Sequence, residues 1–159
     1  MANARVVANR LLELAADKGT SLTPMQVLKL VYIAHGWSLG LTGRPLIDDT
    51  VEAWQYGPVI PTLYSAVKQY GSGAVAGRLP LGFGARADDL SPAENELVRQ
   101  VFDIYGNMSG LALSRITHAP GTPWSQTYAP GKFGTPISRD LIQDHYERLA
   151  RERGDAGNA

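Results

Sequence analysis

Residues 22–70 read LTPMQVLKLVYIAHGWSLGLTGRPLIDDTVEAWQYGPVIPTLYSAVKQY, and this stretch decides the fold. It opens with a capping signal, because Thr23 can cap a helix, Pro24 suits the first helical position and Gln26 can complete a capping box. Apolar residues then occupy nearly every face of the helix predicted for residues 23–41. A helix that is apolar on almost all sides is a buried one, so we predict that it is the central helix of the domain.

The second half of the stretch predicts an extended arm followed by another helix. Short apolar runs flank Asp48-Asp49-Thr50, whose residue types favour a turn. We therefore predict that residues 44–47 and 51–54 form either a small two-stranded hairpin or a pair of extended arms. The pair Gly57-Pro58 interrupts the extended run, and Pro61 suits the first turn of the helix that follows. Two strands alone are marginally stable in water, so the hairpin must pack against the helices.

Four further helices are predicted outside this stretch. Apolar residues recur there with helical spacing over residues 4–18, 91–105, 109–118 and 138–153. Residues 71–89 hold five glycines and little periodicity, which predicts a long and mobile surface loop. Residues 119–136 hold four prolines, three glycines and several aromatic residues, which predicts a packed irregular segment.

The fold class is therefore mainly α. We predict a compact single domain over residues 1–153, made of about six helices around a buried central helix, with a short two-stranded β-hairpin. Residues 154–159 are small and polar or charged, and we expect them to form a disordered tail.

The composition argues against several classes of protein. Fifteen basic and fifteen acidic side chains give a formal net charge of zero, so we do not expect nucleic acid as a partner. The absence of cysteine excludes disulfides, thiolate zinc sites and a cysteine nucleophile, and it suits a reducing cytoplasm. Apolar runs fall short of the roughly 18 residues that a membrane span needs. We therefore expect a cytoplasmic protein without membrane association.

Motifs for catalysis and cofactor binding do not appear in the sequence. His35, His118 and His145 lack the spacing of a metal site, and we predict that His35 and His145 are packing residues. His118 follows a helix end, where its imidazole could hold loop carbonyls or face a partner. A nucleophile elbow and a phosphate-binding glycine loop are also missing from the sequence. We therefore predict that the chain is not an enzyme and that it needs no metal or other cofactor.

Aromatic residues provide the strongest signal for a binding surface. Trp54, Tyr56, Tyr64 and Trp124 are of the types that dominate protein–protein hot spots. Burial statistics favour a core position for Trp37 and Trp54. Tyr56 and Trp124 flank Pro/Gly turns, so we expect them to be the more exposed.

A set of short motifs completes the sequence evidence. They are Lys29-Leu30 with Tyr32; Gly43 with Pro45-Leu46; Glu52-Ala53-Trp54 with Tyr56-Gly57-Pro58-Val59, Pro61 and Leu63-Tyr64; and Thr117-His118 with Pro123-Trp124. The pattern closely resembles the Panacea domain family, also described as SocA-like antitoxins and as phage-associated proteins. The resemblance spans most of the chain, from about Thr23 to Trp124.

The resemblance implies an antitoxin that neutralises a cognate toxin protein by direct binding. One branch of the family is similar to a proteolytic adaptor that delivers its toxin to the ClpXP protease, so ClpXP is a second possible partner. Our hypothesis for the contact is that the junction 54–64 and the loop after His118 form one side of the domain, with these partner-binding residues: Trp54, Tyr56, Gly57, Pro58, Tyr64, His118 and Trp124. Lys29, Tyr32 and Trp37 are expected to be structural residues of the motif. The alternatives are a DNA-binding transcriptional regulator and, in third place, a metal-dependent hydrolase.

Overall fold

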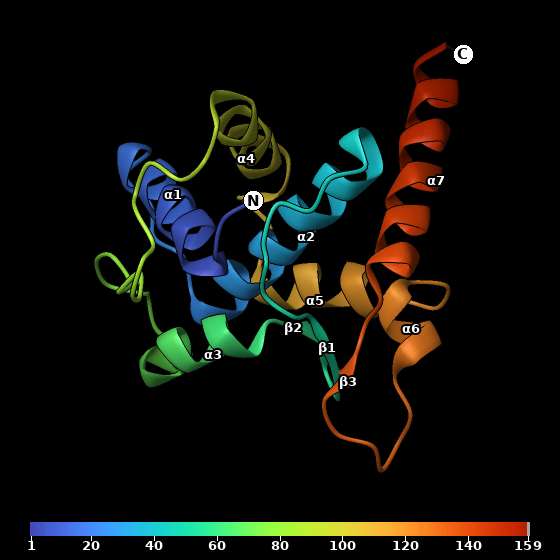
Figure 1. Ribbon diagram of the computed structural model, residues 1–159, viewed down its shortest axis with the longest axis horizontal. Helices are drawn as coiled ribbons and strands as arrows, with labels where there is room; N and C mark the ends of the chain where they lie inside the picture. The colour runs from blue at the N-terminus through green and yellow to red at the C-terminus, as the bar shows by residue number, and fades with distance from the viewer. Residues whose placement is uncertain (159) are drawn as a thin grey trace.

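Helix α2 (Pro24–Thr42) runs through the middle of the protein in the computed structural model, which describes residues 1–158 (Figure 1). Every residue from 27 to 39 in this helix is buried. The Thr23 hydroxyl accepts from the Gln26 backbone N–H, and the Gln26 side chain accepts from the Thr23 backbone N–H at 2.9 Å. The predicted central helix and its capping box are confirmed.

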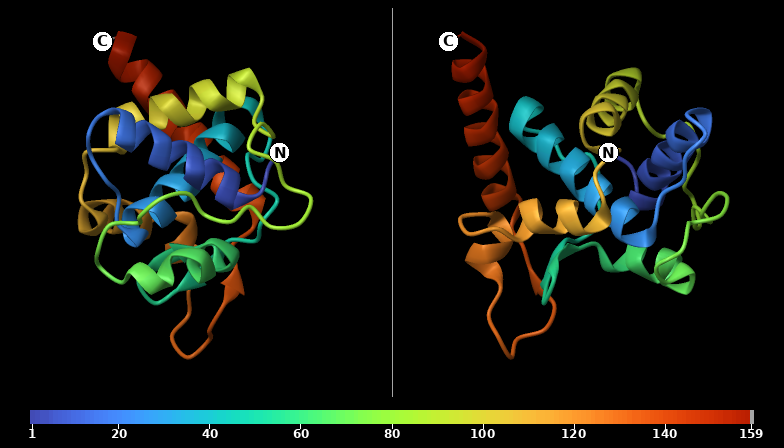
Figure 2. Two further views of the ribbon diagram at one scale, coloured as in Figure 1. Left: turned by 90° about the vertical axis from the view of Figure 1, so that its left-hand side faces the viewer. Right: turned by 180° about the vertical axis from the view of Figure 1, so that it is seen from behind.

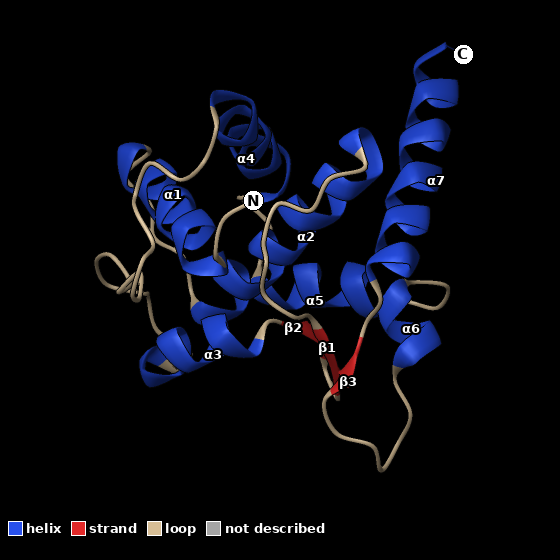
Figure 3. Ribbon diagram, viewed as in Figure 1, coloured by secondary structure: helices blue, strands red, loops and turns tan. Residues whose placement is uncertain are grey.

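Six other α-helices are packed around α2 in the described part of the chain (Figures 2 and 3). They are α1 (Ala4–Asp17), α3 (Pro61–Val67), α4 (Pro92–Tyr105), α5 (Gly110–His118), α6 (Pro123–Thr127) and α7 (Arg139–Asn158), and a 3-10 turn, η1 (Lys68–Tyr70), extends α3. The mainly helical fold class is confirmed. None of the helices in residues 1–158 is both long enough and apolar enough to cross a membrane.

Two helix predictions differ from the structure. Helix α6 forms inside the segment that the sequence predicts as irregular, because the Thr122 hydroxyl caps it and Pro123 occupies its first turn. Helix α7 continues to Asn158, beyond its predicted end at Arg153. Ala159 lies outside the described residues, and the tail assignment for residues 154–159 stays a prediction.

A small antiparallel sheet lies between α3 and α6 in the lower part of the view in Figure 1. Strand β1 (Glu52–Trp54) pairs on one edge with β2 (Gly57–Val59) and on the other with β3 (Thr135–Pro136). Trp54 is paired with Gly57, so the hairpin turn consists of two residues, Gln55 and Tyr56.

The predicted pairing of residues 44–47 with residues 51–54 is wrong. Residues 44–47 run beside the N-terminus instead, where the Ala2 N–H donates to Leu46 O and the Asp48 N–H donates to Ala2 O, each at 3.0 Å. The His35 imidazole is buried in α2 and accepts from the backbone N–H groups of Leu46 and Ile47 at 3.2 and 3.4 Å. These contacts satisfy the backbone of the arm without a hairpin.

The segment between η1 and α4 is attached to the helices. The Asn9 side chain is buried and makes two hydrogen bonds with the Leu79 backbone, at 2.7 and 3.0 Å. The Val75 N–H donates to Leu22 O at 2.8 Å. The segment therefore carries buried anchor points at Val75 and Leu79.

Candidate protein-interaction site

Aromatic side chains gather at the free end of the small sheet. Trp54 is half-buried, its indole N–H donates to Glu52 at 2.9 Å, and its ring meets Tyr64 edge-on at 5.1 Å. Phe133, from the loop before β3, lies 5.0 Å from the same indole and is 79% exposed. Tyr56 occupies the hairpin turn and is 70% exposed. We call these four residues, Trp54, Tyr56, Tyr64 and Phe133, the hairpin surface.

A second aromatic group supports the hairpin from α5 and α6. The Trp124 indole N–H donates to Trp54 O at 2.5 Å, and its ring stacks on Tyr128 at 4.8 Å. His118 meets the Trp124 ring edge-on at 5.5 Å, and its Nδ1 contacts the Ser114 carbonyl of its own helix. His118 and Trp124 are both half-buried. Trp124 is therefore tied to the fold more firmly than Tyr56.

Two polar side chains hold the hairpin backbone in place. The buried Lys29 ammonium of α2 donates to Pro58 O at 2.9 Å, and the buried Ser114 hydroxyl of α5 donates to Tyr56 O at 3.0 Å. Gly57 lies beside the lysine with a φ of +125°, where a Cβ would come within 2.8 Å of Nζ. Only glycine combines this backbone angle with this close approach. Contacts from two helices thus determine the path of the turn.

The candidate residues consequently divide by position. Trp54 and Tyr64 are in ring contact, and Tyr56 lies exposed in the turn of the same hairpin. Gly57 and Pro58 are buried beneath it, so they position the turn. The sequence did not predict two other contributors to this site. They are Phe133, which is far from the hairpin in the chain, and the hydroxyl of Ser114.

Comparisons with known proteins identify the family of the chain. The model of a family described as "Antitoxin SocA-like, Panacea domain" matches residues 27–125, more than half of the chain. The chain belongs to the SocA-like antitoxin family. A similar protein, "Antitoxin SocA" from Caulobacter vibrioides (strain NA1000 / CB15N), is 33% identical over 91% of this chain and 82% of its own length. No solved structure matches the chain.

The Panacea motif residues of α2 lie in the core of this family member. Tyr32 and Trp37 are buried and both rings meet Tyr146 of α7 edge-on, with centroid distances of 6.4 and 5.1 Å. Burial raises the pKa of Tyr32 well above its ordinary value. Lys29 is the motif residue of α2 that bonds to the hairpin. The structural role of these three residues stays a prediction.

Clusters of three or more potential metal ligands are absent from the described side chains. Asp49 has a structural role, because its carboxylate accepts from the Ala4 N–H at 2.7 Å and from the Thr62 hydroxyl. Burial, followed by hydrogen bonding and repulsion from Asp49, raises the pKa of Asp48. Asp49 therefore links the arm to α1 and α3.

Lys29 should make the stability of the fold depend on pH in the mildly alkaline range. Burial lowers its pKa from 10.5 to about 8, so between these values the unfolded chain binds more protons than the folded one. The free energy of unfolding should rise by about 2 kcal/mol between pH 8 and pH 10. Above pH 10 the raised pKa values of Tyr32 and Tyr146 act in the opposite direction, because the unfolded phenols lose protons first.

Urea unfolding of the wild type and of Lys29→Met, measured at pH 8 and at pH 10, tests the predicted rise in the free energy of unfolding. The variant should lack the rise, although the loss of the hydrogen bond to Pro58 O lowers its stability throughout. Equal pH dependence in the two proteins would assign the effect to other groups.

Proposed function

We propose that this chain is an antitoxin that neutralises a cognate toxin protein by direct binding, with the hairpin surface as the contact. The observation that carries the proposal is the exposure of Tyr56 and Phe133 on a two-residue turn and its neighbouring loop. Large exposed aromatic residues are typical anchors of protein–protein interfaces. Membership of the SocA-like family and the similarity to a protein named Antitoxin SocA support the choice of partner.

Hydrogen bonds hold the backbone of the hairpin turn in place, and this order makes the turn better suited to binding a partner than a flexible exposed loop. Lys29 and Ser114 hold the carbonyls on either side of Gly57, and Trp124 holds the carbonyl of Trp54. A turn that is already ordered loses less conformational entropy when a partner binds. The aromatic anchors can therefore contribute their burial energy to the complex.

The binding step needs no catalytic residue in this chain. Neutralisation then follows either because the toxin is blocked sterically or because it is degraded. The family resemblance supports the second route, delivery of the bound toxin to the ClpXP protease, as part of the proposal. Both routes require the same first contact with the toxin. They differ in whether the toxin disappears from cells that express both proteins.

Alanine at Tyr56 tests the proposed contact. The toxin to use is the product of the neighbouring reading frame, provided that its expression alone is lethal. We expect Tyr56→Ala to weaken toxin binding by about 2 kcal/mol, or about thirtyfold in Kd, and to leave the melting temperature unchanged because the side chain makes few contacts within the fold. Calorimetric titration and thermal melts measure the two quantities.

Phe83→Ala is the matched control, because Phe83 is also an exposed aromatic side chain and lies on the segment between η1 and α4. It should bind the toxin with unchanged affinity. Retention of full affinity in both Tyr56→Ala and Phe133→Ala would show that the toxin binds elsewhere. Trp124→Ala is a poorer test, since loss of its hydrogen bond to Trp54 O should change the hairpin itself.

A further inference from the structure

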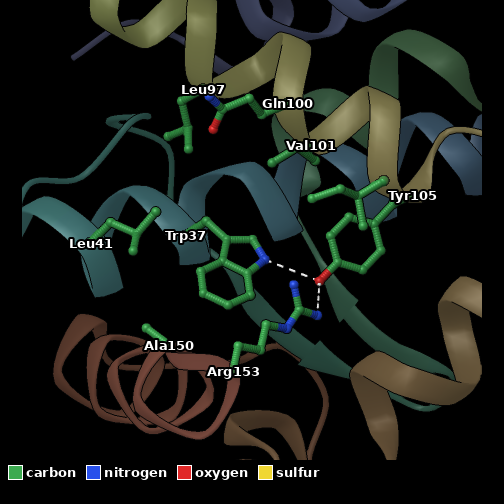
Figure 4. Close-up of a pocket in the computed structure, with 9 residues that line it drawn as sticks. Trp37, Leu41, Leu97, Gln100, Val101, Tyr105, Ala150 and Arg153 are labelled. Atoms are coloured by element: carbon green, nitrogen blue, oxygen red, sulfur yellow. Dashed lines mark hydrogen bonds between the residues drawn. The ribbon is translucent and has the colours of Figure 1, made fainter. Parts of the chain in front are cut away.

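A mainly apolar cavity lies between α2, α4 and α7 (Figure 4). Its volume is about 220 Å³, several times the roughly 30 Å³ that one water molecule occupies in the liquid. Trp37, Val101 and Ala150 form part of its wall, and none of the described side chains that line it is acidic. Leu41 and Ile104, which also line the cavity, are 57% and 60% exposed. The cavity has room for a bulky apolar side chain.

A fixed positive charge borders this apolar space. The Arg153 guanidinium lies 4.8 Å from the centroid of the Trp37 ring and donates to the Tyr105 hydroxyl at 2.8 Å (Figure 4). The Trp37 indole N–H donates to the same hydroxyl at 3.1 Å. Stacking and hydrogen bonding therefore hold the head group of Arg153 in one place. Such a preorganised guanidinium suits a carboxylate.

A groove of larger volume adjoins the cavity along the edges of α2 and α4. This groove has a volume of about 1030 Å³ and shares Leu41, Leu97 and Gln100 with the cavity. Arg44 lines its other part. A groove that continues beyond one apolar cavity fits an extended chain better than a single small molecule.

The ion pairs of the protein leave the two arginines of the groove available. Six ion pairs occur among the described side chains, and neither Arg44 nor Arg153 takes part in them. The two carboxylates that line the groove are already paired, Glu94 with the N-terminal ammonium and Glu96 with Arg99. The available charge in the groove is therefore positive.

We propose that this groove binds an acidic segment of a protein partner, which places a bulky apolar side chain against Trp37 and its carboxylates on Arg153 and Arg44. The apolar wall, the fixed guanidinium and the length of the groove each match one feature of such a segment. The site is separate from the hairpin surface, because α4 and the sheet lie at opposite ends of the molecule in every view (Figures 1 and 2). The proposal goes beyond the toxin contact and does not depend on it.

Selection from a library of short random peptides displayed on phage, with the full chain immobilised, tests the proposal. We expect enriched peptides to carry Leu, Ile, Phe, Met or Trp close to Asp or Glu. Selected peptides, synthesised with a fluorescent label, should bind about tenfold more weakly to Arg153→Gln and to Leu41→Gln than to the wild type. Binding should also weaken as salt is added, since the arginine contacts are exposed to solvent.

Two variants serve as matched controls. Arg148→Gln removes an exposed arginine of the same helix whose hydrogen bond is to Asp144 O, at 3.4 Å, and Tyr56→Ala alters the hairpin surface. Both should bind the peptides as the wild type does. Thermal melts of all four variants show whether each one is folded.

Three results would overturn the proposal. They are a selection that enriches no peptide, enriched peptides without acidic residues, and peptides whose affinity is unchanged in folded Arg153→Gln. Peptides that lose affinity only in Tyr56→Ala would place the binding on the hairpin surface and not in the groove. The affinity of Tyr56→Ala for the toxin tests the proposed function only. Neither outcome of that measurement affects the proposal for the groove.

Discussion

Replacing Gly40 with alanine is expected to lower the free energy of unfolding by about 3 kcal/mol, because it forces two helices apart. A Cβ on Gly40 would lie 2.7 Å from the carbonyl carbon of Tyr146 and 3.0 Å from the backbone nitrogen of Glu147. These are backbone atoms of α7, which cannot rotate away as the end of a side chain can. One turn earlier, a Cβ on Gly36 would lie 2.2 Å from the Tyr146 ring. The two glycines together let α7 pack directly against α2.

The Gly40→Ala substitution should also disturb the packing of the core around Tyr146. Tyr146 is buried between Tyr32 and Trp37, so a displacement of α7 opens the core on that side. Denaturant unfolding of the wild type and Gly40→Ala measures the loss. Gly154→Ala is the matched control, because no heavy atom lies within 4 Å of the Cβ added there. That variant should gain up to about 1 kcal/mol from helix propensity. A Gly40→Ala variant as stable as the wild type would show that α7 can shift freely.

Acidification is expected to destabilise the fold through His35. This imidazole is 1% exposed and accepts hydrogen bonds from the N–H groups of Leu46 and Ile47 at the same nitrogen. Burial, aided by the charge of Arg139 and opposed by that of Asp49, lowers its pKa from 6.5 to about 4. Protonation of that nitrogen in the folded state would break both hydrogen bonds.

The sign of the effect follows from the two states. Between pH 6.5 and pH 4 the unfolded chain protonates this histidine and the folded chain does not, so the free energy of unfolding falls with falling pH. The expected loss is about 3 kcal/mol across that range. Comparison of wild type and His35→Gln at each pH cancels the contribution of the carboxylates that titrate in both proteins. Parallel losses in the two proteins would mean that His35 is not responsible.

Features that depend on neighbouring residues were predicted well from the sequence. The capping box at Thr23 forms as expected, and residues 27–39 of the predicted helix 23–41 are buried. Both signals act over one or two helical turns, so the surrounding fold does not alter them. The motif residues from Lys29 to Trp124 also identified the family.

The strand partners could not be predicted in the same way. Gly57 and Pro58 are residue types that usually interrupt a strand, yet they begin β2. Lys29 and Ser114 bind the carbonyls on either side of Gly57 and hold it there. Residues 44–47 contain a short apolar run that is compatible with a strand, yet the N-terminus and His35 satisfy their backbone. These choices depend on residues that are distant in the chain.

The candidate site shows the same division. Their aromatic residue type predicted Trp54, Tyr56 and Tyr64 as parts of a binding surface. The exposure of Tyr56 was expected because this residue flanks a Pro/Gly turn. Phe133 joins them only because β3 pairs with β1 and carries its preceding loop to the same end of the sheet. The cavity beside Trp37 likewise requires three helices and an arginine from the last of them.

The sequence alone thus determined the buried central helix, its caps, the helical class and the family, because helix periodicity and short motifs are local properties of the chain. The tertiary structure decided which strands pair, which aromatic residues reach the surface and where an apolar cavity meets a fixed charge. Those features arise from contacts between segments far apart in sequence, whose energies depend on how the whole core packs.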